Sequence, residues 1–93
     1  MTMPRYGASV DLNQKPIMDA LKAIGCEVWP IGRPCDLLVG FRKHNFLIEC
    51  KREGVKPRKD QQDQQDWIRD WPGQVRVCST AEEAIRLVTR AYE

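Results

Sequence analysis

The chain lacks any apolar run that approaches the roughly 20 residues needed to span a membrane, so we expect no membrane partner. The amino-terminal segment MTMPRYGASV has no apolar core of the kind found in secretory signal peptides, which favours a cytoplasmic protein. The sequence also has no internal repeat and no low-complexity tract, which disfavours solenoid and fibrous architectures.

Closely spaced cysteine pairs are also absent, because the four cysteines of the chain lie far apart, at positions 26, 35, 50 and 78. None belongs to a C-x-x-C motif. The paired ligand spacing of structural zinc is therefore absent, and a zinc site that combines cysteines with His44 is disfavoured. In a reducing compartment, such widely spaced cysteines are expected to be free thiols at small buried positions.

A strong overall charge is also missing. The formal net charge is +2 over 93 residues, too low for a general polycation, and the length allows one domain with a modest core. Positive charge is nevertheless concentrated in one segment that only Glu53 opposes; its cations are Lys51, Arg52, Lys56, Arg58 and Lys59. This segment is either a solvated loop or a contact for phosphate groups, and its position directly after a predicted strand favours the phosphate contact.

Apolar spacing predicts the element order α-β-β-β-α-β-α, an α/β fold with a central mixed four-stranded sheet flanked by helices. Residues 1–10 show no periodicity and are expected to form an arm, followed by a single domain over 11–93. Asp11 or Asn13 can cap the first helix, and Pro16 favours the later start because proline is tolerated only in the first turn. Strands are predicted over 26–31, 36–41, 46–51 and 74–78, and the later helices over 61–71 and 81–91.

A short polar loop at 42–45 predicts that the second and third strands form an antiparallel hairpin. A two- or four-residue loop centred on Lys43 and His44 pairs Phe41 with Phe46, whereas a three-residue loop would shift the pairing by one residue and separate Asp36 from Glu49. In the even register, three charged side chains share one face of the sheet, namely Asp36, Glu49 and Lys51.

Charged side chains on strands cost free energy unless a metal, a partner or a reaction uses them. Asp36 and Glu49 would supply the oxygen ligands that Mg2+ or Mn2+ prefers. Lys51 beside them would add positive charge where a phosphorane transition state carries extra negative charge. The alternative is a surface aspartate at a strand start with a Glu49–Lys51 pair on a solvated face.

Gln64 lies one helical turn before the apolar residues Trp67, Ile68 and Trp71, on the same stripe of the helix predicted over 61–71. An amide on a stripe that faces the core needs a hydrogen-bond partner. Gln64 is therefore either the frayed end of the stripe or a site residue that points at the sheet.

These elements and motifs resemble those of the PD-(D/E)XK nuclease superfamily, and within it the small stand-alone members of the VRR-NUC family, the virus-type replication-repair nucleases. The resemblance runs from Asp11 to about Val88. It rests on DLNQKPIMDALKAIG, GRPCDLLVG, LIECK, the glutamine in DQQDWIRDW, and GQVRVCSTAEEAI. It implies a restriction-endonuclease-like αβββαβα core.

The resemblance also implies roles for individual residues. Asp36 and Glu49 match the metal-binding carboxylates, Lys51 the lysine that orients or deprotonates the attacking water, and Gln64 the helix glutamine. The backbone carbonyl of Cys50 is implied as a further metal ligand. The family often has a glutamate on its first helix, where this chain has Asn13 and Gln14 as the nearest candidates.

The chain departs from the family pattern just before the aspartate. The residue there is usually proline, but here it is Cys35, with Pro34 one position earlier. This order could alter the backbone that leads into Asp36. It removes no catalytic group.

The function that the resemblance implies is a Mg2+- or Mn2+-dependent DNA endonuclease that cuts branched DNA such as four-way junctions. Small members of the family form homodimers, so the resemblance implies a homodimer here. Trp29 on the predicted edge strand is a candidate interface residue, although packing into the core would explain it equally well. A phage or prophage replication or recombination setting in a bacterial host is implied by analogy. The cations at 52–59, with Lys43 in the hairpin loop, would contact the DNA backbone without reading its sequence.

Two other functions stay open from the residues alone. The first is a nucleic-acid-binding module of the same fold without chemistry, which the altered order of Pro34 and Cys35 would favour. The second is an interaction or inhibitor protein that uses its exposed tryptophans. Phosphate contacts weaken steeply with salt, so the salt dependence of binding separates the two.

Overall fold

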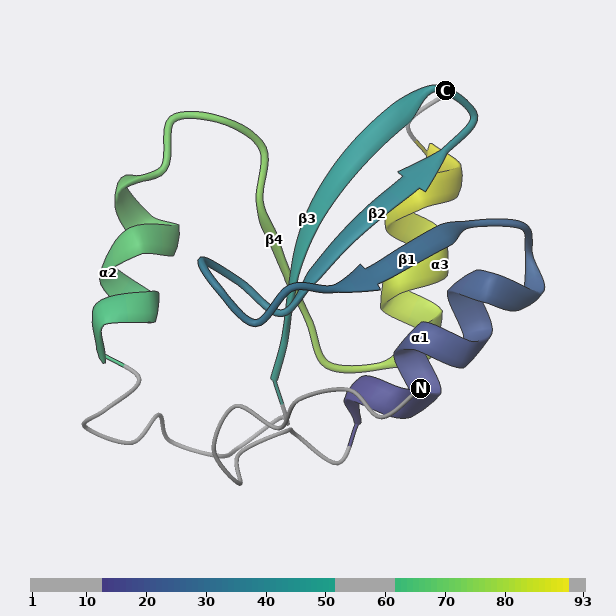
Figure 1. The fold of residues 1–93 in the computed structure, drawn as a ribbon, viewed down its shortest axis with the longest axis horizontal. Helices are drawn as coiled ribbons and strands as arrows, with labels where there is room; N and C mark the ends of the chain where they lie inside the picture. Colours follow the sequence, from purple (N-terminus) through teal and green to yellow (C-terminus); the bar gives the residue numbers. More distant parts are fainter. Residues whose placement is uncertain (1–12, 52–61, 91–93) are drawn as a thin grey trace.

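The computed structural model describes residues 13–51 and 62–90. Its elements in chain order are α1 (Gln14–Ala23), β1 (Glu27–Pro30), β2 (Leu37–Phe41), β3 (His44–Cys50), α2 (Gln62–Asp70), β4 (Arg76–Cys78) and α3 (Ala81–Arg90) (Figure 1). The predicted α/β order is therefore confirmed. The predicted arm over 1–10 and most of the basic segment lie outside the described residues.

The helix α1 begins where Pro16 indicated, with Asn13 at the N-cap position and the proline in the first turn. Its apolar face buries Ile17 and Leu21. The helix ends at Ala23, and Gly25 follows the C-cap residue with a φ of 104°, in the left-handed region that glycine adopts without a steric penalty. The amide of Gly25 donates to the carbonyl of Lys22, 3.0 Å away, so the last turn is closed by a Schellman-type cap.

The strands β2 and β3 form the predicted hairpin, but the predicted register was wrong by two residues. Phe41 pairs with His44 and not with Phe46. The reason is the turn: Arg42 and Lys43 have φ values of 51° and 73°, which is the geometry of a type I′ turn with only two loop residues. A shift of two residues keeps each side chain on its face, so the expected sharing of a face between Asp36 and Glu49 survives the correction.

The four strands form one sheet in the order β1-β2-β3-β4. The pairs β1–β2 and β2–β3 are antiparallel, and β3 pairs with β4 in parallel. A parallel pair needs a crossover, and α2 lies in the connection between these strands. Parallel pairing places Cys50 directly beside Cys78 at the end where the charged residues lie.

One face of the sheet packs against α1 and α3, which also contact each other (Figure 1). Fully or almost fully buried side chains from both layers form the core: Ile17, Leu21, Cys26, Val28, Leu37, Val39, Phe41, Phe46, Ile48, Cys50, Cys78, Ala84 and Val88. The helix α3 starts with a capping box, since the amide of Glu83 donates to Thr80 Oγ1 at 3.1 Å and Glu83 Oε1 accepts from the amide of Ser79 at 3.0 Å.

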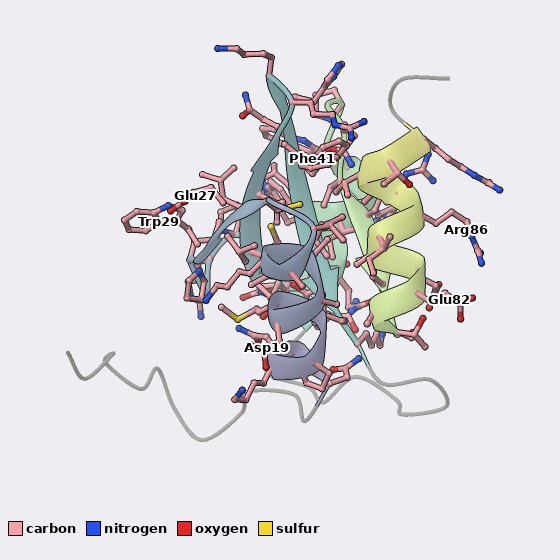
Figure 2. All side chains as sticks on the ribbon, turned by 90° about the vertical axis from the view of Figure 1, so that its right-hand side faces the viewer. Asp19, Glu27, Trp29, Phe41, Glu82 and Arg86 are labelled. Carbon is pink, nitrogen blue, oxygen red and sulfur yellow. The ribbon has the colours of Figure 1, made fainter. Side chains whose placement is uncertain are left out.

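On the opposite face of the sheet, two large apolar side chains are exposed to solvent. Trp29 lies opposite Leu38 in the register, and their exposed fractions are 60% and 40%. Figure 2 shows Trp29 and Glu27 projecting on the side of the molecule away from α3. The Trp29 indole nitrogen donates to Glu27 Oε2 at 3.1 Å, so this indole is oriented along its own strand.

The helix α2 lies on the other side of the sheet from α1 and α3 (Figure 1). The expectation that its apolar stripe faces a core was wrong, since no residue of Gln62–Asp70 is buried. The indoles of Trp67 and Trp71 instead stack on each other with ring centroids 4.7 Å apart, which covers part of each ring without a core.

All four cysteines are free and buried, as their spacing predicted. Across 13–51 and 62–90, no group of three or more His, Cys, Asp or Glu side chains is placed to hold a metal ion. No helix in these same ranges is both long and apolar enough to cross a membrane.

Candidate metal centre at the ends of β2 and β3

Asp36 and Glu49 are linked by hydrogen bonds in both directions between neighbouring strands. Glu49 Oε1 accepts from the backbone amide of Asp36 at 3.2 Å. Asp36 Oδ2 accepts from the backbone amide of Cys50 at 2.8 Å. Each carboxylate thus fixes the backbone next to the other, and the two acids meet at the end of the β2–β3 hairpin that lies far from its turn.

The two carboxylates differ in burial. Glu49 is 7% exposed, whereas Asp36 is half-buried. Burying a carboxylate without a partner is costly, and a backbone N–H group is a strong partner for one of its oxygens. The site therefore combines one buried carboxylate with one that is more accessible, and both would offer oxygen atoms as metal ligands.

Lys51 directly follows β3 and is half-buried. Its backbone amide donates to the carbonyl of Cys78 at 3.0 Å, which ties the end of β3 to the end of β4. Strand alternation puts the Lys51 side chain on the face of Glu49, two residues earlier. The peptide of Cys50 between them carries the carbonyl implied as a metal ligand, and its amide is held by Asp36.

Asn13 reaches this end of the sheet from α1. Its amide nitrogen donates to the carbonyl of Lys51 at 3.0 Å and to the carbonyl of Ser79 at 2.8 Å. Its side chain makes no cap hydrogen bond to α1, although asparagine at an N-cap typically contributes about 1 kcal/mol in that way. The sequence correctly marked the position, but the role as a cap was wrong.

Gln14, the other first-helix candidate, does not reach the site. It is 8% exposed, and its amide nitrogen lies 4.0 Å from the sulfur of Met18 on the same helix. This contact is local to α1. The structure therefore separates the two candidates, and only Asn13 touches the segment that carries Lys51.

Gln64 contacts the loop that leads into Asp36. Its amide nitrogen lies 3.3 Å from the carbonyl of Gly32 and 3.3 Å from that of Pro34, so it donates to both. The same loop is held from the other side, since the amide of Ile31 donates to the carbonyl of Asp36 at 2.9 Å. Gln64 therefore links α2 to the loop that precedes Asp36 in the sequence.

Cys35, which stands where the family usually has proline, is fully buried. Its thiol donates to the carbonyl of Leu37 at 3.7 Å. Burial, with the added negative charges of Glu49 and Asp36, raises the pKa of the Cys35 thiol to about 11. The thiol is therefore neutral at physiological pH.

Of the predicted nucleic-acid contacts, only Lys43 falls within the described residues, and it does not lie at the site. Lys43 lies in the hairpin turn, at the opposite end of β2 from Asp36, which is about 20 Å of extended strand away. The other four, Arg52, Lys56, Arg58 and Lys59, fall outside the described residues.

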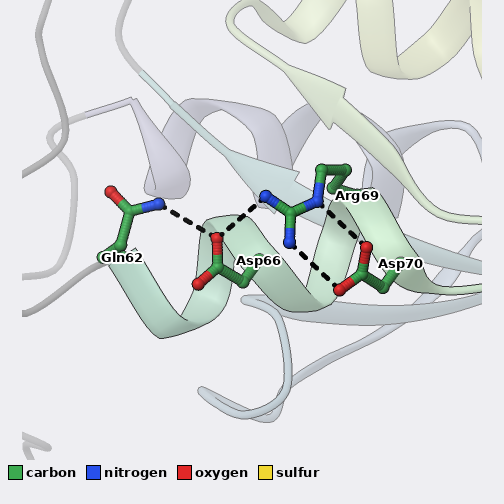
Figure 3. A network of polar contacts seen from close by, with 4 residues as sticks. All are labelled: Gln62, Asp66, Arg69 and Asp70. Atoms are coloured by element: carbon green, nitrogen blue, oxygen red, sulfur yellow. Dashed lines mark hydrogen bonds and ion pairs between the residues drawn. The ribbon is translucent and has the colours of Figure 1, made fainter.

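The outward side of α2 carries an exposed polar network (Figure 3). Arg69 pairs with Asp70 at 2.9 Å and with Asp66 at 3.2 Å, and Gln62 donates to Asp66 at 3.0 Å. The hydrogen bond to Arg69 holds the pKa of the Asp70 carboxyl below its usual value. This side of α2 has more acids than bases, so it is unsuited to phosphate contact.

The oxygen donors at the site suit a hard divalent cation. Mg2+ is usually bound through one or two carboxylates together with waters and substrate phosphates, so Asp36 and Glu49, with the carbonyl of Cys50, would be suitable ligands by chemical type. Sequence reasoning missed the anchoring of Lys51 by Cys78 and Asn13. The parallel β3–β4 pairing that creates it leaves no local signal in the sequence.

Comparison with known proteins adds no relative: no family model, no curated protein and no solved structure matches the chain.

Proposed function

We propose that the chain is a divalent-metal-dependent DNA endonuclease of the VRR-NUC type that cuts branched DNA such as four-way junctions. The observation that carries the proposal is the meeting of Asp36 and Glu49 at adjacent strand ends, with Lys51 two residues beyond. The resemblance in motif order supports the same activity. Asp36, Glu49 and Lys51 all lie within the described residues, whereas the segment 52–59 does not, and DNA binding by that segment is part of the proposal.

The residues divide the work of phosphodiester hydrolysis. Asp36, Glu49 and the Cys50 carbonyl would hold Mg2+ or Mn2+, and a bound ion of this kind polarises a phosphate and lowers the pKa of its water. Lys51 would orient the attacking water and stabilise negative charge on the phosphorane, because its side chain ends in an ammonium group. Gln64 supports the loop before Asp36 and thereby the position of that carboxylate.

The proposed assembly is a homodimer, since one small domain offers one site and a four-way junction needs two cuts. Trp29, 60% exposed on the outer face of the edge strand β1, is the residue proposed for the interface. The proposed setting is the cytoplasm of a bacterial host, within a phage or prophage recombination module.

A nucleic-acid-binding module without chemistry is the second candidate. It is favoured by the fact that one oxygen of Asp36 and one of Glu49 already accept backbone hydrogen bonds, which is also what two purely structural acids would do.

The deciding experiment compares cleavage of a labelled four-way junction with cleavage of a linear duplex of the same sequence. The protein and its Lys51→Ala variant are each assayed with Mg2+, with Mn2+ and with a chelator. Lys22→Ala, the same change at an exposed position in the last turn of α1, is the matched control. We expect metal-dependent cutting of the junction that Lys51→Ala abolishes and Lys22→Ala retains. Tight, salt-sensitive binding without any cutting would support the binding module instead.

A further inference from the structure

Asn13 joins three elements that are far apart in the sequence. Its amide nitrogen donates to the carbonyl of Lys51, 38 residues away, and to that of Ser79, 66 residues away. Both partner atoms are carbonyl oxygens, so only the NH2 group of the amide can face them, one hydrogen to each strand end. The start of α1 is thereby fastened to the ends of β3 and β4.

This geometry is unfavourable for the helix to which Asn13 belongs. The side chain at an N-cap normally accepts a hydrogen bond from the first turn, and that of Asn13 does not. Its oxygen, Oδ1, is buried and has no hydrogen-bond partner in the part of the chain that the structure describes. A buried acceptor without a partner destabilises the fold, so helix stability does not explain why the amide takes this orientation.

The hydrogen bond from Asn13 instead fixes the backbone of Lys51. The Lys51 N–H donates to Cys78 and its C=O accepts from Asn13, so both of its backbone polar groups are held. Ser79 is itself held by the capping box of α3 through Glu83. The direction in which the chain leaves β3, and with it the origin of the Lys51 side chain, is therefore set by contacts to α1, β4 and α3.

We propose that Asn13 is a positioning residue that holds Lys51 in place relative to Asp36 and Glu49 by binding its backbone carbonyl. The role assigned to Asn13 is that of a backbone anchor, because its amide nitrogen donates to two carbonyl oxygens at strand ends. The catalytic consequence of this role rests on the proposed endonuclease function; the structural consequence does not.

The test uses Asn13→Ser in the full chain, with Asn45→Ser as a matched control. Serine can cap α1 but is too short to bridge both carbonyls, whereas Asn45 is exposed on the hairpin. We expect kcat for the junction to fall at least about tenfold in Asn13→Ser, with KM within about twofold of the unmodified protein. Its thermal midpoint should fall by only a few degrees, because the cap hydrogen bond that serine adds to α1 offsets part of the two donations lost. Asn45→Ser should match the unmodified protein in all three quantities.

A second variant covers the case in which Asn13→Ser does not fold. In Asn13→Asp the ionised carboxylate faces two carbonyl oxygens, while its protonated form can donate to one of them. We expect the activity of Asn13→Asp, relative to that of the unmodified protein at the same pH, to rise on acidification from pH 8 to pH 5.5. A ratio that stays flat over this range overturns the proposal.

The third measurement is independent of cleavage. Hydrogen exchange of the Lys51 amide, followed by NMR without DNA or metal, should accelerate at least about tenfold in Asn13→Ser and not in Asn45→Ser. If the unmodified protein cuts no DNA, the endonuclease proposal fails, and this exchange rate alone judges the role of Asn13. Unchanged exchange together with unchanged kcat in Asn13→Ser would show that Asn13 positions nothing.

Discussion

The side chain of Glu49 accepts a hydrogen bond from the backbone amide of Asp36, so the buried acid of the site holds the backbone of the accessible one. An amide in place of the Glu49 carboxylate keeps an oxygen that can accept this bond but loses the charge that a metal needs. The structural and chemical roles of Glu49 can therefore be separated.

For Glu49→Gln we expect a thermal midpoint within a few degrees of that of the unmodified protein, together with a loss of metal-dependent cutting of at least about 100-fold. Calorimetry and the junction assay measure the two effects. Glu27→Gln, the same change at an exposed residue of β1, is the control and should leave both unchanged. Retained cutting in Glu49→Gln would remove Glu49 from the metal site.

The buried thiols predict a loss of stability at alkaline pH. Burial raises the pKa of Cys35 from its ordinary value of 9.0 to about 11. Above pH 9 the unfolded chain releases the thiol proton, whereas the folded chain keeps it until about pH 11. Ionisation therefore favours the unfolded state, and the stabilisation present below pH 9 is lost as the pH rises through this window.

The measurement is the free energy of unfolding from urea titrations between pH 8 and pH 11. A shift of two pKa units corresponds to at most about 3 kcal/mol, so Cys35→Ala should lose less stability over this window than the unmodified protein does. Lysines that titrate in the same range cancel in this difference. Parallel curves for the two proteins would contradict the protonated state assigned to Cys35.

The hairpin turn holds a lysine where glycine is favoured. Lys43 has a φ of 73°, and a non-glycine residue in the left-handed region carries a penalty of about 1 kcal/mol. Lys43→Gly should therefore raise the urea midpoint of unfolding. Lys22→Gly, in the last turn of α1, should lower it, since glycine weakens a helix. Lys43 is the position to change because the Arg42 guanidinium lies over the Phe41 ring, 4.8 Å from its centroid.

Gly73 lies against the indole of Trp71, which stacks on Trp67 of α2. A Cβ atom added at Gly73 would lie 2.7 Å from the indole nitrogen of Trp71, so this ring must move in Gly73→Ala. We expect a change in the near-ultraviolet circular dichroism that reports the Trp67–Trp71 stack, with a loss of stability below about 1 kcal/mol because the ring lies at the surface. Gly40→Ala is the control, since its added Cβ would meet no atom within 4 Å.

The basic segment makes a prediction about specificity. Replacing Lys56, Arg58 and Lys59 together by alanine should weaken binding to every DNA sequence by about the same factor and reduce its salt dependence. Fluorescence anisotropy with unrelated duplexes at several salt concentrations measures both. A loss confined to one sequence would mean that the segment reads bases and does not merely contact phosphates.

The sequence was sufficient to predict the element order, because apolar periodicity and turn residues are local signals. Pro16 correctly indicated the start of α1, and the even register of the hairpin was enough to bring Asp36 and Glu49 to one face. The pairing itself was missed because Arg42 and Lys43 are not typical residues of a type I′ turn. The role of Asn13 was missed because contacts spanning 38 and 66 residues depend on the parallel β3–β4 pair.

The parallel pairing of β3 with β4 also affects when the site is completed during folding. The β2–β3 hairpin closes over a two-residue turn, whereas β4 can dock only after the chain from Lys51 to Arg76 has looped back. Closing a long loop costs entropy before any contact compensates for it, so local hairpins generally form first. Asp36 and Glu49 would therefore meet early, while the anchoring of Lys51 by Cys78 and Asn13 waits for the last strand. A chain that is only partly folded, or cut off before β4, would carry both acids and no fixed lysine.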